Sequence, residues 1–312
     1  MTVGVAAFGA GASAAVLAGL AAVEAVGVGD IGGFAVFAAI AADGHAIGAE
    51  TQRGGLAALR RDLERRGLVA RANAATVAAL ISSGPDRPEP LAQFLPASGA
   101  GLVTGHRLPN TPGIDGVALN AAVLRRLEAG EAPSDAVAAV LAANPEVDAG
   151  LIAVIPGRLA FADSRRVARR NDRGEARLDV RDGAAGVAVL HNSIRPHEGL
   201  AAVAAGAARL VLEAALAPLP SFRVPAGITL ELGAADGVWL DRHGAVERIA
   251  AGNPGLARYA GWTSSAVYLG TPVRQDGRTV GVTVAEARCR LDRGRIVGVD
   301  PARPAVAWRP AG

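Results

Sequence analysis

The sequence contains no lysine, so arginine supplies all 32 of its basic side chains. A chain without lysine cannot use a Walker A lysine, a Schiff-base lysine, a Ser–Lys dyad or a kinase-type catalytic lysine. Its single cysteine, Cys289, cannot form an internal disulfide or a zinc site with several thiolates. This use of cysteine fits a reducing compartment, and we expect a cytoplasmic protein.

Aromatic residues are also scarce, at 4% of the 312 residues, so small and aliphatic side chains must fill the core. The hydrophobic fraction of 51% is that of a globular protein. The net charge is only +3, and the arginine-rich stretch 165–173 has no aromatic side chain for base stacking, so no nucleic-acid partner is expected. The uncharged N-terminal run is interrupted by glycines and has no basic residue before it, which argues against a membrane segment.

Apolar runs predict the order of elements. Residues 3–8 predict a buried strand, and the run 34–41, apolar at every position, predicts an inner strand that ends in a hairpin turn. Helices are expected over residues 14–26, 55–66, 70–81, 114–128, 134–143 and 200–217. After Pro218, short alternating apolar segments between glycine turns replace the helices. We therefore expect one domain over residues 1–217 and a β-rich module over residues 218–312.

Gly9, Gly11 and Ala14 form a G-x-G-x-x-A pattern between the first predicted strand and helix. Such a turn lets backbone N–H groups approach a pyrophosphate. The same glycines also allow a helix to pack closely on a strand, and the acidic residue expected about 20 positions later does not end a second strand. A nucleotide- or dinucleotide-dependent enzyme with a doubly wound fold is kept as an alternative.

Thr2 stands at the start of the first predicted strand. Removal of Met1 would give this threonine a free α-amine, which has an ordinary pKa of about 7.7–8.0. That amine can take the hydroxyl proton and make Oγ nucleophilic. Thr is equally common as a second residue with no catalytic role, so both interpretations stay open.

Two polar segments follow predicted strands, and loops after strands often carry functional side chains. The first contains Thr104, His106 and Arg107, and the second contains His191, Asn192 and Arg195. We expect the two segments to line one cleft. The catalytic candidates are Thr2, His191 and Asn192, of which the last two would contact a polarised carbonyl. The substrate-binding candidates are Thr104, His106, Arg107 and Arg195, because planar guanidinium groups suit a carboxylate.

The histidines have no spacing typical of metal ligands, and no other pattern indicates a cofactor. We expect neither a metal nor a cofactor.

Four short segments carry a resemblance to a known family. They are the apolar hairpin 34–48, the glycine-started strand 101–104, the helix pair and strand of 114–155, and the strand and turn of 186–194. From about residue 34 to 217 the chain resembles a poorly characterised bacterial family with the N-terminal-nucleophile (Ntn) hydrolase type of sandwich. In that architecture the nucleophile opens a central strand. The matching strand here begins near Gly33 without a Ser, Thr or Cys, which leaves Thr2, on an earlier strand, as the candidate.

The resemblance implies an α+β fold, a four-layer αββα Ntn-hydrolase-like sandwich, to which a C-terminal β-rich module is added. It implies an amide-bond hydrolase or acyl-transfer enzyme acting on a small polar substrate, with a carboxylated one among the options. A non-catalytic binding or scaffold protein is a further alternative. The expected partner is a small-molecule substrate, without nucleic acid or membrane, and homo-oligomerisation is left open.

Overall fold

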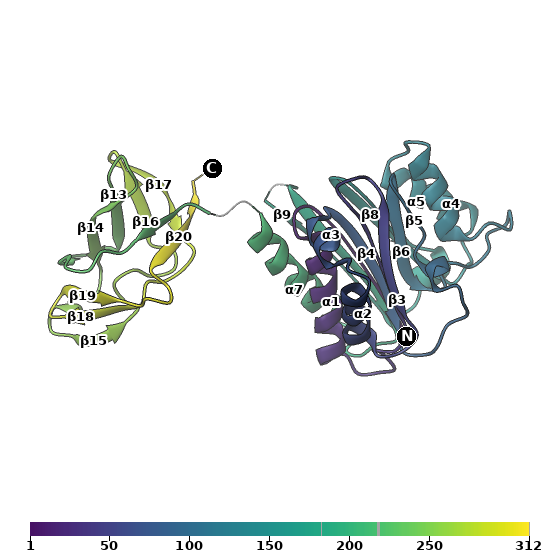
Figure 1. The fold of residues 1–312 in the computed structure, drawn as a ribbon, viewed down its shortest axis with the longest axis horizontal. Coiled ribbons are helices and arrows are strands. Elements are labelled where there is room, and N and C mark those ends of the chain that lie inside the picture. The colour runs from purple at the N-terminus through teal and green to yellow at the C-terminus, as the bar shows by residue number, and fades with distance from the viewer. Residues whose placement is uncertain (182, 217–218, 312) are drawn as a thin grey trace. The chain divides into compact units, whose positions relative to one another are not determined.

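The computed structural model describes residues 1–181, 183–216 and 219–311, and it divides into two units, Met1–Leu216 and Ala217–Gly312 (Figure 1). The boundary predicted between residues 217 and 218 lies outside the described residues. Each unit has hydrophobic clusters of its own, and the protein belongs to the mixed α+β class.

The first unit is organised by a six-stranded sheet in which every neighbouring pair is antiparallel. Its strands, in spatial order, are β3 (Ala46–Thr51), β2 (Ala35–Ile40), β4 (Val77–Ser83), β1 (Thr2–Phe8), β10 (Ala185–Asn192) and β9 (Arg173–Val180). A doubly wound fold requires parallel strands with crossover helices. The doubly wound alternative is therefore wrong.

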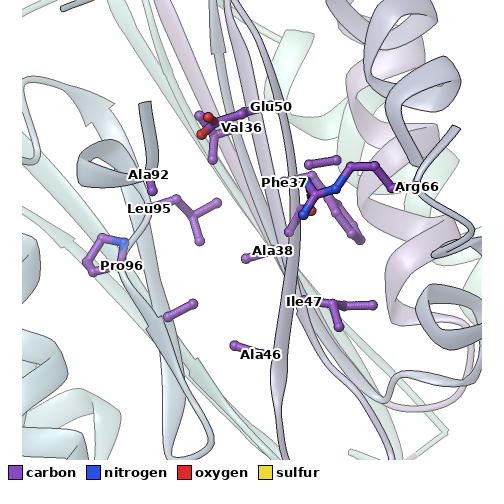
Figure 2. Close-up of a pocket in the computed structure, with 13 residues that line it drawn as sticks. Val36, Phe37, Ala38, Ala46, Ile47, Glu50, Arg66, Ala92, Leu95 and Pro96 are labelled. Atoms are coloured by element: carbon purple, nitrogen blue, oxygen red, sulfur yellow. Dashed lines mark hydrogen bonds between the residues drawn. The ribbon is translucent and has the colours of Figure 1, made fainter. Parts of the chain in front are cut away.

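A second, four-stranded sheet faces the first across an apolar layer. Its strands are β5 (Ala97–Ser98), β6 (Gly101–Arg107), β7 (Ala149–Ile155) and β8 (Arg158–Asp163). Phe8 and Leu190 of the first sheet meet Leu102 and Ile152 of the second in this layer. Between strands β2 and β3 on one side and the 3-10 helix η1 (Leu91–Phe94) on the other, the layer opens into a pocket of about 350 Å³ (Figure 2). None of the predicted site residues lines this pocket.

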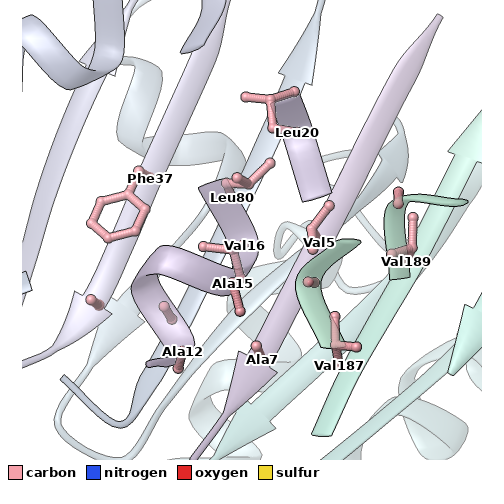
Figure 3. Packing of buried hydrophobic residues seen from close by; sticks show 14 of the residues in the cluster. Val5, Ala7, Ala12, Ala15, Val16, Leu20, Phe37, Leu80, Val187 and Val189 are labelled. Carbon is pink, nitrogen blue, oxygen red and sulfur yellow. The ribbon is translucent and has the colours of Figure 1, made fainter. Parts of the chain in front are cut away.

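Helices cover the outer faces of both sheets (Figure 1). On the first sheet these are α1 (Ala12–Val26), α2 (Gly55–Arg65), α3 (Val69–Ala74) and α7 (Leu200–Ala215). Figure 3 shows Val5 and Ala7 of β1 and Val187 and Val189 of β10 packed with Val16 and other side chains of α1. On the second sheet α4 (Leu119–Glu128) and α5 (Pro133–Ala143) form a separate cluster with β6 and β7. Because both faces of the first sheet are covered, its inner strands are apolar except at the end where β1 begins and β4 and β10 finish.

The continuous apolar run 34–41 forms a strand that is buried on both faces. All of its residues are buried, with exposures between 0% and 7%, as predicted for an inner strand. The helix predicted over residues 70–81 is wrong, because the helical part α3 ends at Ala74 and is followed by β4. β4 lies between β1 and β2, where a short continuous apolar run is a strand buried on both faces.

The second unit contains strands and one 3-10 helix, η2 (Pro254–Ala257), in its described residues 219–311. A seven-stranded sheet has the order β11 (Ser221–Arg223), β20 (Ala305–Pro310), β17 (Arg278–Thr283), β16 (Pro272–Gln275), β13 (Gly237–Leu240), β14 (Val246–Ala251) and β12 (Glu231–Leu232). A three-stranded sheet has the order β15 (Ala260–Thr263), β18 (Cys289–Asp292) and β19 (Arg295–Val299). In the described chain, no helix has the length and apolar character that a membrane crossing requires.

Candidate functional site

Thr2 opens β1, which lies between β4 and β10 in the middle of the first sheet. Its register partners are Ser83 at the end of β4 and Asn192 at the end of β10. Alternate residues of a strand share a face. Ala6 and Phe8 of β1 pack between the two sheets, so Thr2 projects to that same face. The same alternation applies to Ser83 and Asn192, and we call these three side chains the Thr2 row.

The second sheet approaches the Thr2 row closely. A Cβ atom on Gly4 of β1 would overlap the carbonyl oxygen of Gly105 of β6, so the two backbones meet without side chains between them. This contact brings the end of β6 to the end of β10. The backbone N–H of Arg107 donates to Oδ1 of Asn192 at 3.2 Å. The structure thus brings together the two polar segments that the sequence singled out.

The Asn192 amide is oriented by this contact. Because Oδ1 accepts from Arg107, Nδ2 is the donor, and it donates to Oγ of Ser193 at 3.1 Å. An amide nitrogen carries two hydrogens, so one N–H of Asn192 is left for another acceptor. Arg107 and Ser193 both have left-handed backbones, with φ of 60° and 58°. Such conformations cost of order 1–3 kcal/mol in non-glycine residues and occur at functional sites.

Arg107 does not present a free guanidinium to the site. Its side chain is 7% exposed, and it donates to Asp172 at 2.6 Å and to Asp148 at 3.2 Å. Asp172 also accepts from Ser193 Oγ at 2.7 Å and from Arg170. Hydrogen bonds from Arg170 and Ser193, with the charge of Arg107, hold the pKa of Asp172 well below its usual range. Arg107 therefore links Asp148 to Asp172, and Asp172 in turn contacts Ser193, the residue after Asn192.

The α-amine at the start of β1 is partly buried, and the guanidinium groups near it act on it more strongly than the carboxylates of Asp30 and Asp172. Burial lowers the pKa of the α-amine of Met1, and the guanidinium groups of Arg87 and Arg107 lower it further. Sδ of Met1 accepts from the backbone N–H of Asp30 at 2.8 Å, and Thr2 is only 3% exposed. Cleavage of the Met1–Thr2 bond would give Thr2 a free α-amine.

Both predicted histidines are buried, and within the described part of the chain neither ring is hydrogen-bonded to Thr2. His106 Nε2 lies 2.7 Å from Asp163, whose other oxygen contacts Arg173 at 3.0 Å. His191 alternates with Leu190 and Asn192, so it faces the helices together with Val189. Burial lowers the pKa of His191 to about 4, with smaller contributions from other histidines, so its ring is neutral at pH 7.

The remaining predicted substrate contacts have other positions. Thr104 donates its hydroxyl to the carbonyl of Leu80 at 2.8 Å and so links the two sheets. Arg195 is exposed, and its backbone pairs with Val28.

The glycine-rich turn after β1 is used for packing. Gly9 and Gly11 have φ of 102° and 80°. A Cβ atom on Gly9 would overlap Ala185 of β10, and one on Gly11 would lie 2.5 Å from the Cβ of Ala215 of α7. Both glycines thus fit the packing interpretation of the pattern.

Sequence reasoning missed Ser83 and Arg87. Both follow the segment 70–81, which was predicted to be a helix, so neither was placed at a strand end. The signal that could have found them is the Ser82-Ser83-Gly84 sequence after the apolar run 77–81, which resembles the strand end at Thr104 and Gly105. Asp172 was missed because its pairing with Arg107, 65 residues away, is not visible in the sequence, and Ser193 lies in the second polar segment but was not singled out there.

The family model described as "Domain of unknown function (DUF6963)" matches residues 2–220. The chain belongs to this family. The DUF6963 match contains the Thr2 row and both sheets of the first unit. A second model, "Domain of unknown function (DUF7259)", matches residues 227–303 in the second unit. A search of curated proteins gave no match to this DUF6963 protein.

The described residues of the DUF6963 protein contain no group of three or more His, Cys, Asp and Glu side chains that could hold a metal ion. Its candidate site is instead a row of hydroxyl and amide groups flanked by guanidinium groups. A hydroxyl group with an amine as its base can attack a carbonyl carbon. An amide N–H can then bind the oxyanion that forms.

Proposed function

We propose that the chain is an amide-bond hydrolase or acyl-transfer enzyme of the N-terminal-nucleophile type, in which Thr2 is the nucleophile after cleavage of the Met1–Thr2 bond. The observation that carries the proposal is the position of Thr2 at the start of a central strand, between Ser83 and Asn192. The succession of helices, sheet, sheet and helices supports a four-layer αββα sandwich of the Ntn-hydrolase type.

In the proposed reaction, the α-amine of Thr2 takes the Oγ proton while Oγ attacks the carbonyl carbon of the substrate amide. The carbonyl oxygen becomes an oxyanion and accepts from the remaining N–H of Asn192. The C–N bond then breaks, and the leaving nitrogen takes the proton from the α-ammonium, which leaves an ester on Oγ. Water attacks the ester with the α-amine as base, the bond between the acyl carbon and Oγ breaks, the carboxylic acid leaves, and the α-ammonium returns its proton to Oγ. A different nucleophile in place of water gives acyl transfer.

The charges and burial at the start of β1 favour the α-amine of Thr2 as a base. An α-amine accepts a proton only in its neutral form, which burial and neighbouring guanidinium groups favour. These influences lower the pKa of the amine on Met1. We expect them to act in the same direction on an amine one residue further along β1.

The test uses the full chain and two variants of Thr2. Intact mass first determines whether the purified chain begins at Thr2. A simple β-lactone such as β-butyrolactone is then added, and peptide mapping locates the ester that it forms. We expect acylation of Thr2 in the wild type and in Thr2→Ser, and none in Thr2→Ala. Retention of Met1, or equal labelling of Thr2→Ala, contradicts the proposal.

A further inference from the structure

Arg87 and Arg107 both lie near the Thr2 row, but their terminal nitrogens make different contacts. Its Nε donates to Oγ of Ser83 at 3.2 Å. Among the described residues, no carboxylate lies within ion-pair distance of Arg87, and its two Nη atoms donate to no protein acceptor. Arg107, by contrast, uses both Nη atoms on Asp148 and Asp172. Arg87 is therefore the cation beside the row that can bind a ligand without first breaking an ion pair.

The backbone of Arg87 is held in place by a side chain from the first sheet's edge. Gln52 accepts from the N–H of Arg87 at 2.9 Å and donates to its carbonyl at 2.5 Å. Nearby, a Cβ atom on Gly33 would overlap the carbonyl oxygen of Gly84, so the two loops pack backbone to backbone. The Arg87 side chain is thus fixed at its root by Gln52 and at Nε by Ser83. Holding a binding group in place before the ligand arrives reduces the entropy lost on binding.

The fixed guanidinium lies close to the proposed nucleophile. Ser83 is the register partner of Thr2, and the Cβ atoms of directly opposed residues in an antiparallel pair are about 4.5–5.5 Å apart. Because Nε donates to Ser83 Oγ, the guanidinium lies beside the register partner of Thr2, and its charge acts on the α-amine at the start of β1. A planar guanidinium binds a carboxylate through two parallel hydrogen bonds.

We infer that Arg87 forms a carboxylate subsite, so that the substrate is an amide with a carboxylate a few bonds from its scissile carbonyl. This inference rests on the proposed function, because it assumes that Thr2 attacks that carbonyl. It reassigns the carboxylate contact from Arg107 and Arg195 to a residue that holds no competing acid. Asp30 acts on Arg87 only at longer range, and burial lowers the pKa of the guanidinium, so a bound carboxylate would offset part of its desolvation.

The experiment compares two β-lactone probes of the same skeleton, one with a free carboxylate and the other with its methyl ester. The measured quantity is the ratio of the rates at which the two probes acylate Thr2, followed by intact mass. We expect the wild type to prefer the carboxylate by about 10–100-fold, the usual worth of a hydrogen-bonded charge. Arg87→Met should bring the ratio close to one.

Two further variants separate position from charge. Arg53 lies in a neighbouring loop, is paired with Asp86, and is not part of the site, so Arg53→Met removes the same charge and should keep the preference. Ser83→Ala keeps the charge of Arg87 but releases its Nε, and it should lower the preference several-fold. A thermal melt checks that each variant is folded.

The outcomes distinguish the two proposals. Equal acylation of the wild type by both probes overturns the carboxylate subsite and leaves Thr2 as the nucleophile. An unchanged preference in a folded Arg87→Met variant also overturns the subsite. If neither probe acylates a chain that begins at Thr2, the proposed function fails, and the subsite fails with it.

Discussion

The backbone N–H of Arg107 donates to the side chain of Asn192 across 85 residues of sequence and between two sheets. Arg107 ends β6 of the second sheet, and Asn192 ends β10 of the first. The bond satisfies a partly buried donor, and it fixes which end of the Asn192 amide is the acceptor. One contact thus serves both the stability of the sheet pair and the orientation of the proposed oxyanion donor.

Two substitutions at Asn192 separate these contributions. Asn192→Asp keeps an acceptor for Arg107 and removes the Nδ2 donor. We expect it to slow acylation of Thr2 by about 10²–10³-fold, the usual cost of losing one oxyanion donor. Asn192→Ala should be equally slow and should also lower the free energy of unfolding by about 1–3 kcal/mol, because the Arg107 N–H loses its partner. Acylation rates and urea melts check the pair, and a fully active Asn192→Asp variant would refute the oxyanion role.

The second prediction concerns the close approach of β1 and β6. Gly4→Ala places a Cβ atom on the carbonyl of Gly105, so the sheets must separate. We expect a loss of at least about 3 kcal/mol in the stability of the first unit, in the range of severe overpacking.

Gly206→Ala is the matched control for Gly4→Ala. Gly206 lies inside α7, and a Cβ atom there meets nothing within 4 Å. This change should stabilise the unit by about 0.5–1 kcal/mol through helix propensity. Helical circular dichroism follows the first unit, since every α-helix of the described residues lies there, whereas the tryptophans Trp239, Trp262 and Trp308 report on the second. Equal stability of the two glycine variants would contradict the close approach.

The general fold class was predictable because continuous apolar runs have few alternatives. The run 34–41 has no polar position, is only eight residues long and is followed by an Asp-Gly turn, which together favoured a strand covered on both faces. The run 77–81 is also apolar at every position, but it follows a short helical sequence without a glycine or proline between them. Periodicity alone does not separate a buried helix from a buried strand. The pairing of β4 with both β1 and β2 decides the question, and this pairing is a property of the whole sheet.

The site was predictable to the extent that it follows strand ends. Asn192 and Arg107 both follow short apolar runs, and the structure joins them through a hydrogen bond. The faces of the strands were not predictable, because one residue of register decides whether His191 or Asn192 points between the sheets. The partners of Arg107 were also hidden, since Asp148 and Asp172 lie 41 and 65 residues away in sequence.

The third prediction uses the buried Cys289 of the second unit. Burial raises the pKa of its thiol to about 11 from an ordinary value of 9.0. Only the thiolate reacts with iodoacetamide, so at pH 8 the folded protein should be alkylated at least about 100-fold more slowly than the urea-unfolded chain. Mass spectrometry over time measures both rates. Rapid alkylation of the folded protein would contradict a buried thiol.

The last prediction concerns pH and His191. Burial lowers its pKa to about 4 from an ordinary value of 6.5, and the charges of His106 and His197 act in the same direction. Above pH 6.5 the ring is neutral in both states, and its contribution to stability is complete. Between pH 6.5 and 4 the unfolded chain binds a proton that the folded chain does not, so stability falls as the pH falls. Below pH 4 the folded chain also binds the proton, and this loss levels off.

A shift of this size corresponds to about 3 kcal/mol across that window. We expect His191→Gln to be less stable than the wild type at pH 7 but to lose less stability on acidification, so that the difference between the two narrows by about 3 kcal/mol from pH 7 to 4. Carboxylates titrate in both proteins, and their contribution cancels in the difference. Urea melts at several pH values, followed by helical circular dichroism, measure it. A constant difference between His191→Gln and the wild type would mean that His191 is not buried as a neutral ring.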